Sequence, residues 1–238
     1  MKSLLLAAGL GTRLKPVTDN IPKCLVPLQD RPLLSYWLSL LIKGGCHPIL
    51  VNTHHFAQKV EEYIKASEYR NYVQIVFEKE LLGTGGTVLK NRNFFGSEAF
   101  MLVHADNLSL FDVHEFIECH QARPAGCEMT MMTYFTPSPE TCGIVELDKK
   151  GVVKSFYEKV SYPPGNLANG AVYILEPSVI DFLAGLGKDH IDFSTEVLPY
   201  FLGRIFTFHN NVYHRDIGNL ESYEQALKDI VQLGRSFK

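Results

Sequence analysis

The sequence lacks the features that mark disulfide-stabilised, membrane and nucleic-acid-binding proteins. Its five cysteines are an odd number with no Cys-x-x-Cys pair, which disfavours a disulfide framework and a zinc knuckle. The formal net charge is only −3, so no basic field favours nucleic acid or an acidic membrane. The first apolar run, residues 3–11, is too short to cross a bilayer. We therefore expect a cytoplasmic protein without a nucleic-acid or membrane partner.

Low-complexity linkers, internal repeats and charged blocks are also missing from the sequence. Hydrophobic residues make up 46% of the chain and charged residues 21%, which is an ordinary globular composition. A length of 238 residues is enough for a domain with its own core. We expect one domain over residues 1–238, with a change of pattern near residue 125.

Strand-like and helix-like patterns alternate before that point and give way to mostly strand-like ones after it. This order predicts an α/β fold, a doubly wound, mostly parallel mixed sheet of Rossmann-like type flanked by helices. Ligands bind such sheets at the carboxyl ends of the strands. The predicted strands are 2–8, 47–54, 73–78, 99–107, 127–135, a hairpin over 142–159, and 169–177. The predicted helices are 31–45, 57–69, 85–95, 109–123 and 219–234.

A glycine-rich loop follows the first predicted strand. Gly9 and Gly11 begin a Gly-x-Gly pattern, but the third glycine of the dinucleotide-binding fingerprint is replaced by Leu14. That glycine allows close helix–strand packing, so its loss disfavours a dinucleotide site. The spacing of a P-loop is absent as well. What remains is a loop whose glycines let backbone N–H groups approach an anion.

Cationic and hydroxyl side chains accompany this loop. Thr12 offers a hydroxyl group and Arg13 a guanidinium fork, both suited to phosphate oxygens. Lys23 follows in a segment that Pro22 and Pro27 hold extended. The pattern predicts a phosphate-binding site; the alternative is a tight strand-to-helix turn with ordinary surface cations.

The stretch LLLAAGLGTRLKPVTDNIPKCLVPL resembles the signature of the sugar-phosphate nucleotidyltransferases, L-A-x-G-x-G-T-R-L-x-P-x-T-x-x-x-P-K-x-L-x-P. Later segments match that family in order: EKELLGTGG, LVHADN, CGIVELD, EK at 158–159, NGAVYI and DIGNLESYEQA. The similarity is greatest to the compact mannose-1-phosphate and heptose-1-phosphate guanylyltransferases. It implies a nucleotide-binding half over about 1–125 and a sugar-phosphate-binding half over about 126–238.

The resemblance implies a Mg²⁺-dependent reaction in which a sugar 1-phosphate attacks the α-phosphorus of a nucleoside triphosphate and pyrophosphate leaves. Catalysis is then mostly positioning and charge neutralisation. It assigns Arg13 to the departing pyrophosphate, Lys23 to the reacting phosphates, and Asp106 and Asp216 to the metal ion. The nucleotide-binding residues that it implies are Leu6, Ala7, Ala8, Gly9, Gly11, Thr12, Arg13, Lys23, Glu78, Gly83, Thr84 and Asp106.

The resemblance also places Glu78 against the base and assigns Gly143, Glu158, Lys159 and Asn169 to the sugar phosphate. A carboxylate only accepts hydrogen bonds, and guanine offers two neighbouring donors, which favours GTP. The sugar itself stays open.

Three alternatives stay open beside this interpretation. The first is a uridylyl- or thymidylyltransferase acting on another sugar 1-phosphate, such as that of N-acetylmuramic acid. The second is an idle, regulatory homologue that binds a nucleotide-sugar; it would be expected to lose Arg13, Lys23 or one of the aspartates, yet all are present. The third concerns Asp106 alone, which could serve only as a turn or capping acid before a helix at 109–123. The implied partners are the two substrates, and many relatives self-associate.

Overall fold

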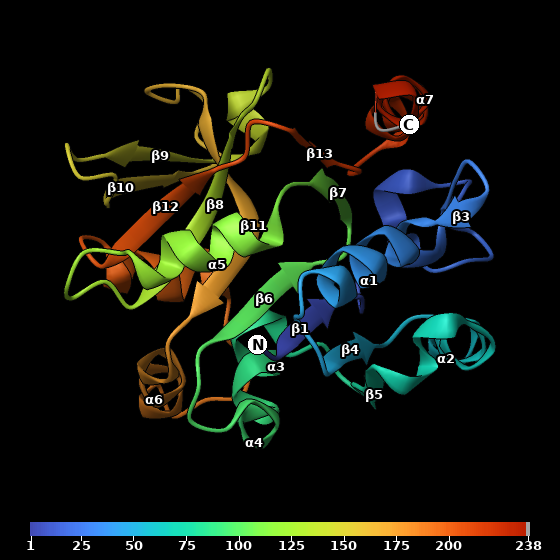
Figure 1. The fold of residues 1–238 in the computed structure, drawn as a ribbon, viewed down its shortest axis with the longest axis horizontal. Coiled ribbons are helices and arrows are strands. Elements are labelled where there is room, and N and C mark those ends of the chain that lie inside the picture. Colours follow the sequence, from blue (N-terminus) through green and yellow to red (C-terminus); the bar gives the residue numbers. More distant parts are fainter. Residues whose placement is uncertain (237–238) are drawn as a thin grey trace. The chain divides into compact units, whose positions relative to one another are not determined.

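The computed structural model describes residues 1–236, which form two compact units built from interleaved segments of the chain (Figure 1). The first unit comprises Met1–Leu4, Leu81–Val103 and Phe111–Asn211. The second comprises Leu5–Glu80, His104–Leu110 and the described residues from Val212 onward. The α/β fold class is confirmed: a mixed sheet with a parallel core is flanked by helices. The single domain and its two contiguous halves stay predictions.

The second unit contains the strand pair β4 and β5, both from the N-terminal third of the chain. β4 pairs in parallel with β5, with Ile49 opposite Val73, and all five residues of β4 are buried, as expected for a strand covered on both faces. Its helices are α1 (Leu33–Lys43), α2 (Ala57–Ala66) and α7 (Leu220–Ser236). Its strands are β2 (Pro27–Leu28), β3 (Arg31–Pro32), β4 (Ile49–Thr53), β5 (Val73–Phe77), β7 (Asn107–Leu110) and β13 (Tyr213–Asp216). Strands β1 (Ser3–Leu6) and β6 (Phe100–His104) contribute residues to both units.

The first unit is built on a mostly antiparallel set of strands. They follow the order β10-β9-β11-β6, and β8 pairs with both β11 and β12. Only β12 runs parallel to β8. The strands are β8 (Met129–Phe135), β9 (Gly143–Leu147), β10 (Val153–Glu158), β11 (Leu167–Leu175) and β12 (Ile205–His209). The helices are α3 (Gly83–Lys90), α4 (Arg92–Phe95), α5 (Val113–Gln121) and α6 (Pro177–Gly185).

The predicted hairpin and most predicted strands are confirmed. The turn between β9 and β10 is closed by the carboxylate of Asp148, which accepts hydrogen bonds from the N–H groups of Lys150 (2.8 Å) and Val152 (2.9 Å). Helix α6 and strands β12 and β13 carried no sequence prediction. Strands β12 and β13 pair with strands that are distant in the sequence, β8 and β7, so local periodicity does not reveal them.

The helix predicted over 109–123 is wrong at its start. Asn107–Leu110 forms strand β7, and helix α5 begins only at Val113. Asp112 caps that helix, because its side chain accepts hydrogen bonds from the N–H groups of His114 (2.8 Å) and Glu115 (3.3 Å). Asp106 therefore lies in the turn between two strands and does not cap a helix.

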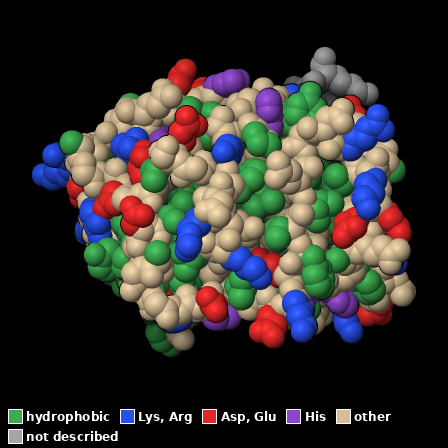
Figure 2. Space-filling model, turned by 90° about the horizontal axis from the view of Figure 1, so that it is seen from below, with side chains coloured by type: hydrophobic (Ala, Val, Ile, Leu, Met, Phe, Trp, Pro, Cys, Tyr) green, Lys and Arg blue, Asp and Glu red, His purple; other side chains and the backbone are tan. Residues whose placement is uncertain are grey.

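The exposed side chains match the balanced charge of the sequence. Lysine, arginine, aspartate and glutamate side chains are interspersed over the face drawn in Figure 2, as expected for a net charge of −3. Among residues 1–236, no helix is both long and apolar enough to span a membrane.

Candidate active site

Lys23 is the centre of a charged cluster in the second unit. It opens a short 3-10 turn after Pro22, and only 7% of the residue is exposed. Its Nζ atom donates a hydrogen bond to Oδ2 of Asp106 at 2.8 Å and lies 3.8 Å from Oδ1 of Asp216. A buried ammonium group is costly unless it is paired. The structure thus brings together three of the residues predicted to act on phosphates and metal.

Asp106 stays ionised in this cluster. Burial acts to raise the pKa of its carboxyl group, but the Lys23 ammonium and His104 nearby, with the hydrogen bond from Lys23, lower that pKa to about 2. Both carboxylates remain accessible, since the side chains of Asp106 and Asp216 are 45% and 55% exposed. The cluster therefore presents the ionised carboxylate of Asp106 and the side chain of Asp216 to a ligand, with the Lys23 side chain beside them.

The pairing of β7 with β13 holds the two aspartates next to each other. Asp216 lies opposite Asn107 in this antiparallel pair, and the N–H group of Ile217 donates to the backbone oxygen of Asp106 at 3.3 Å. Gly218 leaves room for the Asp216 carboxylate, because a Cβ atom there would lie 2.7 Å from Oδ2. Strand β7, which the sequence did not reveal, is thus the element that aligns the site.

Helix α7 forms hydrogen bonds to two of the segments that carry the charged cluster. Tyr223 donates from its hydroxyl group to the backbone oxygen of Pro27 at 2.6 Å, in the segment that carries Lys23. Asp229 Oδ2 accepts hydrogen bonds from the hydroxyl group of Tyr213 (2.8 Å) and from Nε of Arg215 (2.9 Å), in the strand that ends at Asp216. Sequence analysis placed a helix over 219–234 but did not assign these contacts.

A single hydrophobic cluster lies behind the same residues. Its members come from α7, from Leu28 and Leu33, and from positions one to three residues away from Arg13, Lys23, Asp106 and Asp216. Packing and hydrogen bonds thus fix the same geometry. The buried members are Leu14, Val26, Leu28, Leu33, Leu108, Ile217, Tyr223, Ala226 and Ile230. We call this group the α7 core.

The glycine-rich loop has the backbone freedom that its sequence predicts. Gly11 has a φ of +67°, and a Cβ atom there would lie 3.1 Å from Cγ2 of Thr18 and 3.2 Å from Cβ of Lys23. Thr18 donates from its hydroxyl group to the backbone oxygen of Gly11 at 2.7 Å. Glycine is therefore required for both conformation and space. Thr12 and Arg13 are exposed.

The residues directly before the glycine-rich loop are at least partly buried, and Asn52 binds one of their backbone amides. Leu6, at the end of β1, is half-buried, Ala7 and Ala8 are buried, and Gly9 is exposed. The N–H group of Ala7 donates to Oδ1 of Asn52, a buried side chain, at 2.7 Å. This amide is thus already bound within the protein, whereas the loop from Gly9 onward faces outward.

Glu78 lies directly after β5 and is 1% exposed. Its N–H group donates to the backbone oxygen of Thr53 at 2.8 Å, and its own backbone oxygen lies 2.8 Å from Nδ1 of His54. Glu80, two residues later, is exposed. A base could contact the Glu78 carboxylate only at the back of a pocket or after a local rearrangement, so its role stays a prediction.

In the first unit, the glycines at the start of α3 pack against the chain near Ile191. Gly83 has a φ of +70°, and a Cβ atom there would lie 2.5 Å from the backbone oxygen of Ile191. That oxygen accepts a hydrogen bond from the N–H group of Gly85 at 3.0 Å. Close packing alone thus requires glycine at both positions. Thr84 between them is half-buried, and contact of this segment with a nucleoside stays a prediction.

The four predicted sugar-phosphate residues all lie in the first unit. Gly143 is opposite Glu158 in the pairing of β9 with β10, and a Cβ atom at Gly143 would lie 2.8 Å from Oε2 of Glu158. Nζ of Lys159 lies 3.0 Å from Oε1 of Glu158. Asn169 donates from Nδ2 to the hydroxyl oxygen of Tyr173 at 2.6 Å. A Cβ atom at Gly143 would also lie 2.6 Å from Cζ of Phe156, so the glycine leaves room for both the Phe156 ring and the Glu158 carboxylate.

Two further residues of this region were missed by sequence analysis. Tyr173 is buried, and burial raises the pKa of its phenol. Asp192 precedes a helical turn; burial acts to raise its pKa, but hydrogen bonds from Thr195 and the nearby Lys159 ammonium lower it. Tyr173 stands in the matching segment NGAVYI, in which only Asn169 was assigned a role, and Asp192 stands in none of the matching segments.

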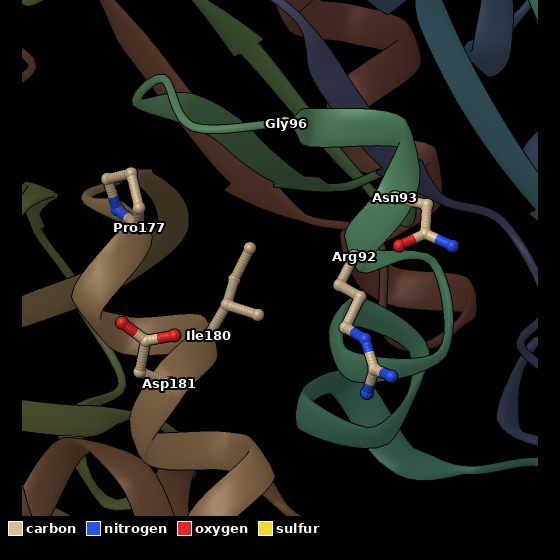
Figure 3. Close-up of a pocket in the computed structure, with 6 residues that line it drawn as sticks. All are labelled: Arg92, Asn93, Gly96, Pro177, Ile180 and Asp181. Carbon is tan, nitrogen blue, oxygen red and sulfur yellow. The ribbon is translucent and has the colours of Figure 1, made fainter.

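A separate groove of about 370 Å³ lies between α4 and α6 in the same unit. Figure 3 shows Ile180 pointing from α6 toward α4, with Asp181 and Arg92 on opposite sides. None of the predicted site residues is among those lining it, which are Arg92, Asn93, Gly96, Pro177, Ile180 and Asp181.

A sequence model of the family described as "Nucleotidyl transferase" matches residues 2–232. This chain belongs to the nucleotidyl transferase family. The match spans both compact units and includes every residue predicted for the site.

Among known proteins, this nucleotidyl transferase is 30% identical over 251 residues to a UTP–glucose-1-phosphate uridylyltransferase from Synechocystis sp., covering 97% of this chain and 63% of that protein. It is 30% identical over 184 residues to mannose-1-phosphate guanylyltransferase catalytic subunit beta from Drosophila melanogaster, covering 76% and 49%. A crystal structure of HddC from Yersinia pseudotuberculosis complexed with GMP-PN matches with a TM-score of 0.81 and 26% identity, covering 96% and 99%. The chain spans between about half and just under two thirds of the length of these two curated relatives.

The donor atoms of the cluster fit a magnesium ion. Asp106 and Asp216 offer hard carboxylate oxygens, and both are partly exposed. Within the described part of the chain, histidine, cysteine and acidic residues form no group of three or more that could hold a metal. Magnesium suits such a site, because it takes one or two carboxylates and completes its shell with water and phosphate oxygens.

Proposed function

We propose that this nucleotidyl transferase transfers a nucleotidyl group from a nucleoside triphosphate, with GTP as the preferred donor, to a sugar 1-phosphate of the mannose or heptose type. A phosphate oxygen of the sugar attacks the α-phosphorus. The bond from that phosphorus to the bridging oxygen breaks, and pyrophosphate leaves with the electron pair. The products are a nucleotide-sugar and pyrophosphate.

The observation that carries this proposal is the position of Lys23, buried and 2.8 Å from Asp106. Two anionic substrates react only where positive charge offsets their repulsion, and a preorganised ammonium group costs no reorganisation during the reaction. Lys23 is fixed by its carboxylate partners before substrate binds. Arg13, exposed on the flanking loop, is free to reach the departing pyrophosphate.

Asp106 and Asp216 would hold Mg²⁺ in this reaction. When bound, the ion supplies a Lewis acid that neutralises charge on the phosphates. The two residues themselves orient Lys23, and Asp106 keeps its ionised form at neutral pH, because Lys23 and His104 hold its pKa at about 2 against the effect of burial.

The sugar phosphate would bind to the predicted sugar-phosphate residues of the first unit. The carboxylate of Glu158 accepts hydrogen bonds from sugar hydroxyl groups, and the amide of Asn169 both donates and accepts. Lys159, an exposed ammonium, binds the 1-phosphate.

The donor base has two candidates. GTP is favoured by the acceptor-only chemistry of Glu78 and by similarity to the Drosophila guanylyltransferase. UTP is the second candidate, because the relative from Synechocystis is a uridylyltransferase at the same identity.

The direct test measures pyrophosphate release from GTP, UTP, dTTP, CTP and ATP, each with a panel of sugar 1-phosphates, in Mg²⁺ and in chelator. We expect a chelator-sensitive signal with GTP and mannose or heptose 1-phosphate. A signal with UTP alone would keep the reaction and discard the base assignment. Absence of pyrophosphate release with every substrate pair, from folded protein that still binds nucleotide, would overturn the proposed reaction.

A pair of variants tests the base assignment. We expect Glu78→Gln to shift the ratio of kcat/KM for GTP and UTP by about tenfold, because one acceptor becomes a donor. The matched control is Glu80→Gln, an exposed glutamate two residues away, which should leave the ratio unchanged. The opposite result would move base recognition to Glu80.

A further inference from the structure

Three of the four predicted sugar residues, Gly143, Glu158 and Asn169, form part of one row across the sheet of the first unit. Gly143 on β9 lies opposite Glu158 on β10, and Asn169 on β11 lies opposite Thr133 on β8. Directly paired residues point their side chains to the same face of a sheet. Each pair therefore presents both of its members on one face.

A third pairing joins these two pairs. Ala168 lies opposite Ile144, so the next antiparallel step sets Asn169 beside Gly143. The alternation of side chains confirms the assignment of faces, because the neighbours in sequence form a packed cluster on the opposite face. That cluster consists of Tyr134, Ile144 and Ala168, with Cys142 and Tyr157 packed against it.

The row does not stop at the residues that sequence analysis identified. On β12, His209 lies opposite Thr133, and its Nδ1 atom is 3.3 Å from the Thr133 hydroxyl oxygen. Phe135, two residues along β8 and therefore on the same face, is 64% exposed. Its ring centroid lies 4.6 Å from that of His209. An exposed phenyl ring beside a hydroxyl and an imidazole is the mixture of surfaces that sugars bind.

We propose that Phe135 and His209 extend the sugar site and bind a neutral substituent of the sugar, an exocyclic hydroxyl-bearing carbon or an acyl group. This inference rests on the proposed function, since it specifies the sugar that the same site selects. The imidazole of His209 hydrogen-bonds the polar atoms of the substituent, and the Phe135 ring covers its carbon atoms. Thr133 is 1% exposed and positions His209 from behind.

The length of the row supports an extended ligand. From Glu158 to His209 it crosses five strands, which is about 19 Å at a spacing of roughly 4.8 Å between strands. A pyranose ring held by Glu158 and Asn169 covers only the part of the row between β10 and β11. The remaining end, on β8 and β12, is available to groups attached to the ring.

Burial of His209 supports the neutral character of this end, because burial lowers the pKa of its imidazole. At neutral pH the ring therefore offers one donor and one acceptor. An anionic substituent would find a phenyl ring and a hydroxyl group in place of a cation.

The test compares matched sugar 1-phosphates that differ by one neutral group: mannose with its seven-carbon homologue, and glucose with N-acetylglucosamine. Binding is measured by saturation-transfer NMR and turnover by pyrophosphate release, in wild-type protein, His209→Gln and Phe135→Ala. We expect wild-type protein to prefer the larger member of at least one pair. Each variant should raise KM for that member about tenfold and leave KM for the smaller member and for the nucleotide within twofold.

The control is Tyr200→Ala, because Tyr200 is also exposed in the first unit but stacks on Phe182; it should change neither KM. Turnover with the same substrate preference in all variants would overturn the inference and leave the proposed function intact. Binding preference that the variants lose, without pyrophosphate release, would support the inference and overturn the function. Absence of sugar phosphate binding to wild-type protein would overturn both.

Discussion

The second unit holds its candidate site by charge, and the first holds its candidate site by strand register. Lys23, Asp106 and Asp216 come from three distant segments and meet through ion pairs of 2.8 and 3.8 Å. Glu158 and Asn169 lie on two strands of one sheet, and backbone pairing sets their spacing. The charged cluster suits phosphates, whereas the row suits hydroxyl groups.

This difference predicts different responses to substitution. Removing one charge from the cluster leaves the remaining charges uncompensated, so the effect should be large and fall on the chemical step. Removing one side chain from the row leaves the backbone ladder intact, so the effect should be smaller and fall on recognition of the sugar. Substitutions in the charged cluster should therefore have larger effects than substitutions in the row.

The largest effect is expected for Lys23→Met, which keeps the length of the side chain and removes its charge. Turnover should fall about a thousandfold, as when a preorganised electrostatic group is removed from other active sites. Steady-state kinetics and circular dichroism would measure activity and fold. The control is Lys15→Met, an exposed lysine that pairs with Asp19 in the same unit. Near-normal turnover of the Lys23 variant would remove this residue from the reaction.

Asp216→Asn and Asp106→Asn should have the next largest effects. Each removes one hard ligand, so the Mg²⁺ concentration that gives half-maximal activity should rise about tenfold or more. The control is Asp19→Asn, an exposed aspartate of the same unit. Magnesium titrations that overlay the wild-type curve would exclude the altered residue from metal binding.

Smaller effects are expected from α7, whose residues touch neither substrate. Tyr223→Phe removes the 2.6 Å hydrogen bond to the backbone of Pro27, and Asp229→Asn weakens the hold on Tyr213 and Arg215. Each loss is worth about 1 kcal/mol of stability. Because the same contacts position Lys23 and Asp216, kcat should fall several-fold while both KM values change little.

Exposed Lys228 on the same helix supplies the control for these variants. Lys228→Ala should leave kcat and the unfolding midpoint unchanged. A loss of stability in Tyr223→Phe without any change in kcat would show that α7 supports the fold alone and does not position the site.

The same contrast explains what could be predicted from the sequence. The glycine-rich loop and the Lys23 segment are contiguous motifs, so their residue types and spacing could be recognised in the sequence. The position of Lys23 beside both aspartates agrees with these motifs. Strands β7 and β13 were missed, because each is four residues long and acquires its structure only by pairing across the chain. His209 and Thr133 were missed for a related reason: their position in the row depends on register between strands, which no local pattern encodes.

The smallest predicted effect concerns His120, a buried residue of the first unit that lies beside the ion pair between Arg123 and Glu176. His120 is 3% exposed, with Nδ1 2.8 Å from the hydroxyl oxygen of Thr130 and Nε2 3.1 Å from Oε1 of Glu176. Burial and the nearby Arg123 guanidinium lower the pKa of its imidazole, although Glu176 acts to raise it. His120 is therefore neutral in the folded protein at neutral pH.

The unfolded chain takes up a proton at His120 at higher pH than the folded protein does, because its pKa there is near the usual 6.5. The free energy of unfolding should therefore decrease as the pH falls below about 6.5 and continue to decrease toward the lower, folded-state pKa. His120→Gln keeps hydrogen-bonding groups but does not titrate, so urea unfolding between pH 7.5 and 5 should show a shallower slope for this variant. Lys228→Ala should keep the wild-type slope, since Lys228 is an exposed residue of the second unit. Equal slopes for wild-type protein and His120→Gln would mean that His120 contributes nothing to acid sensitivity.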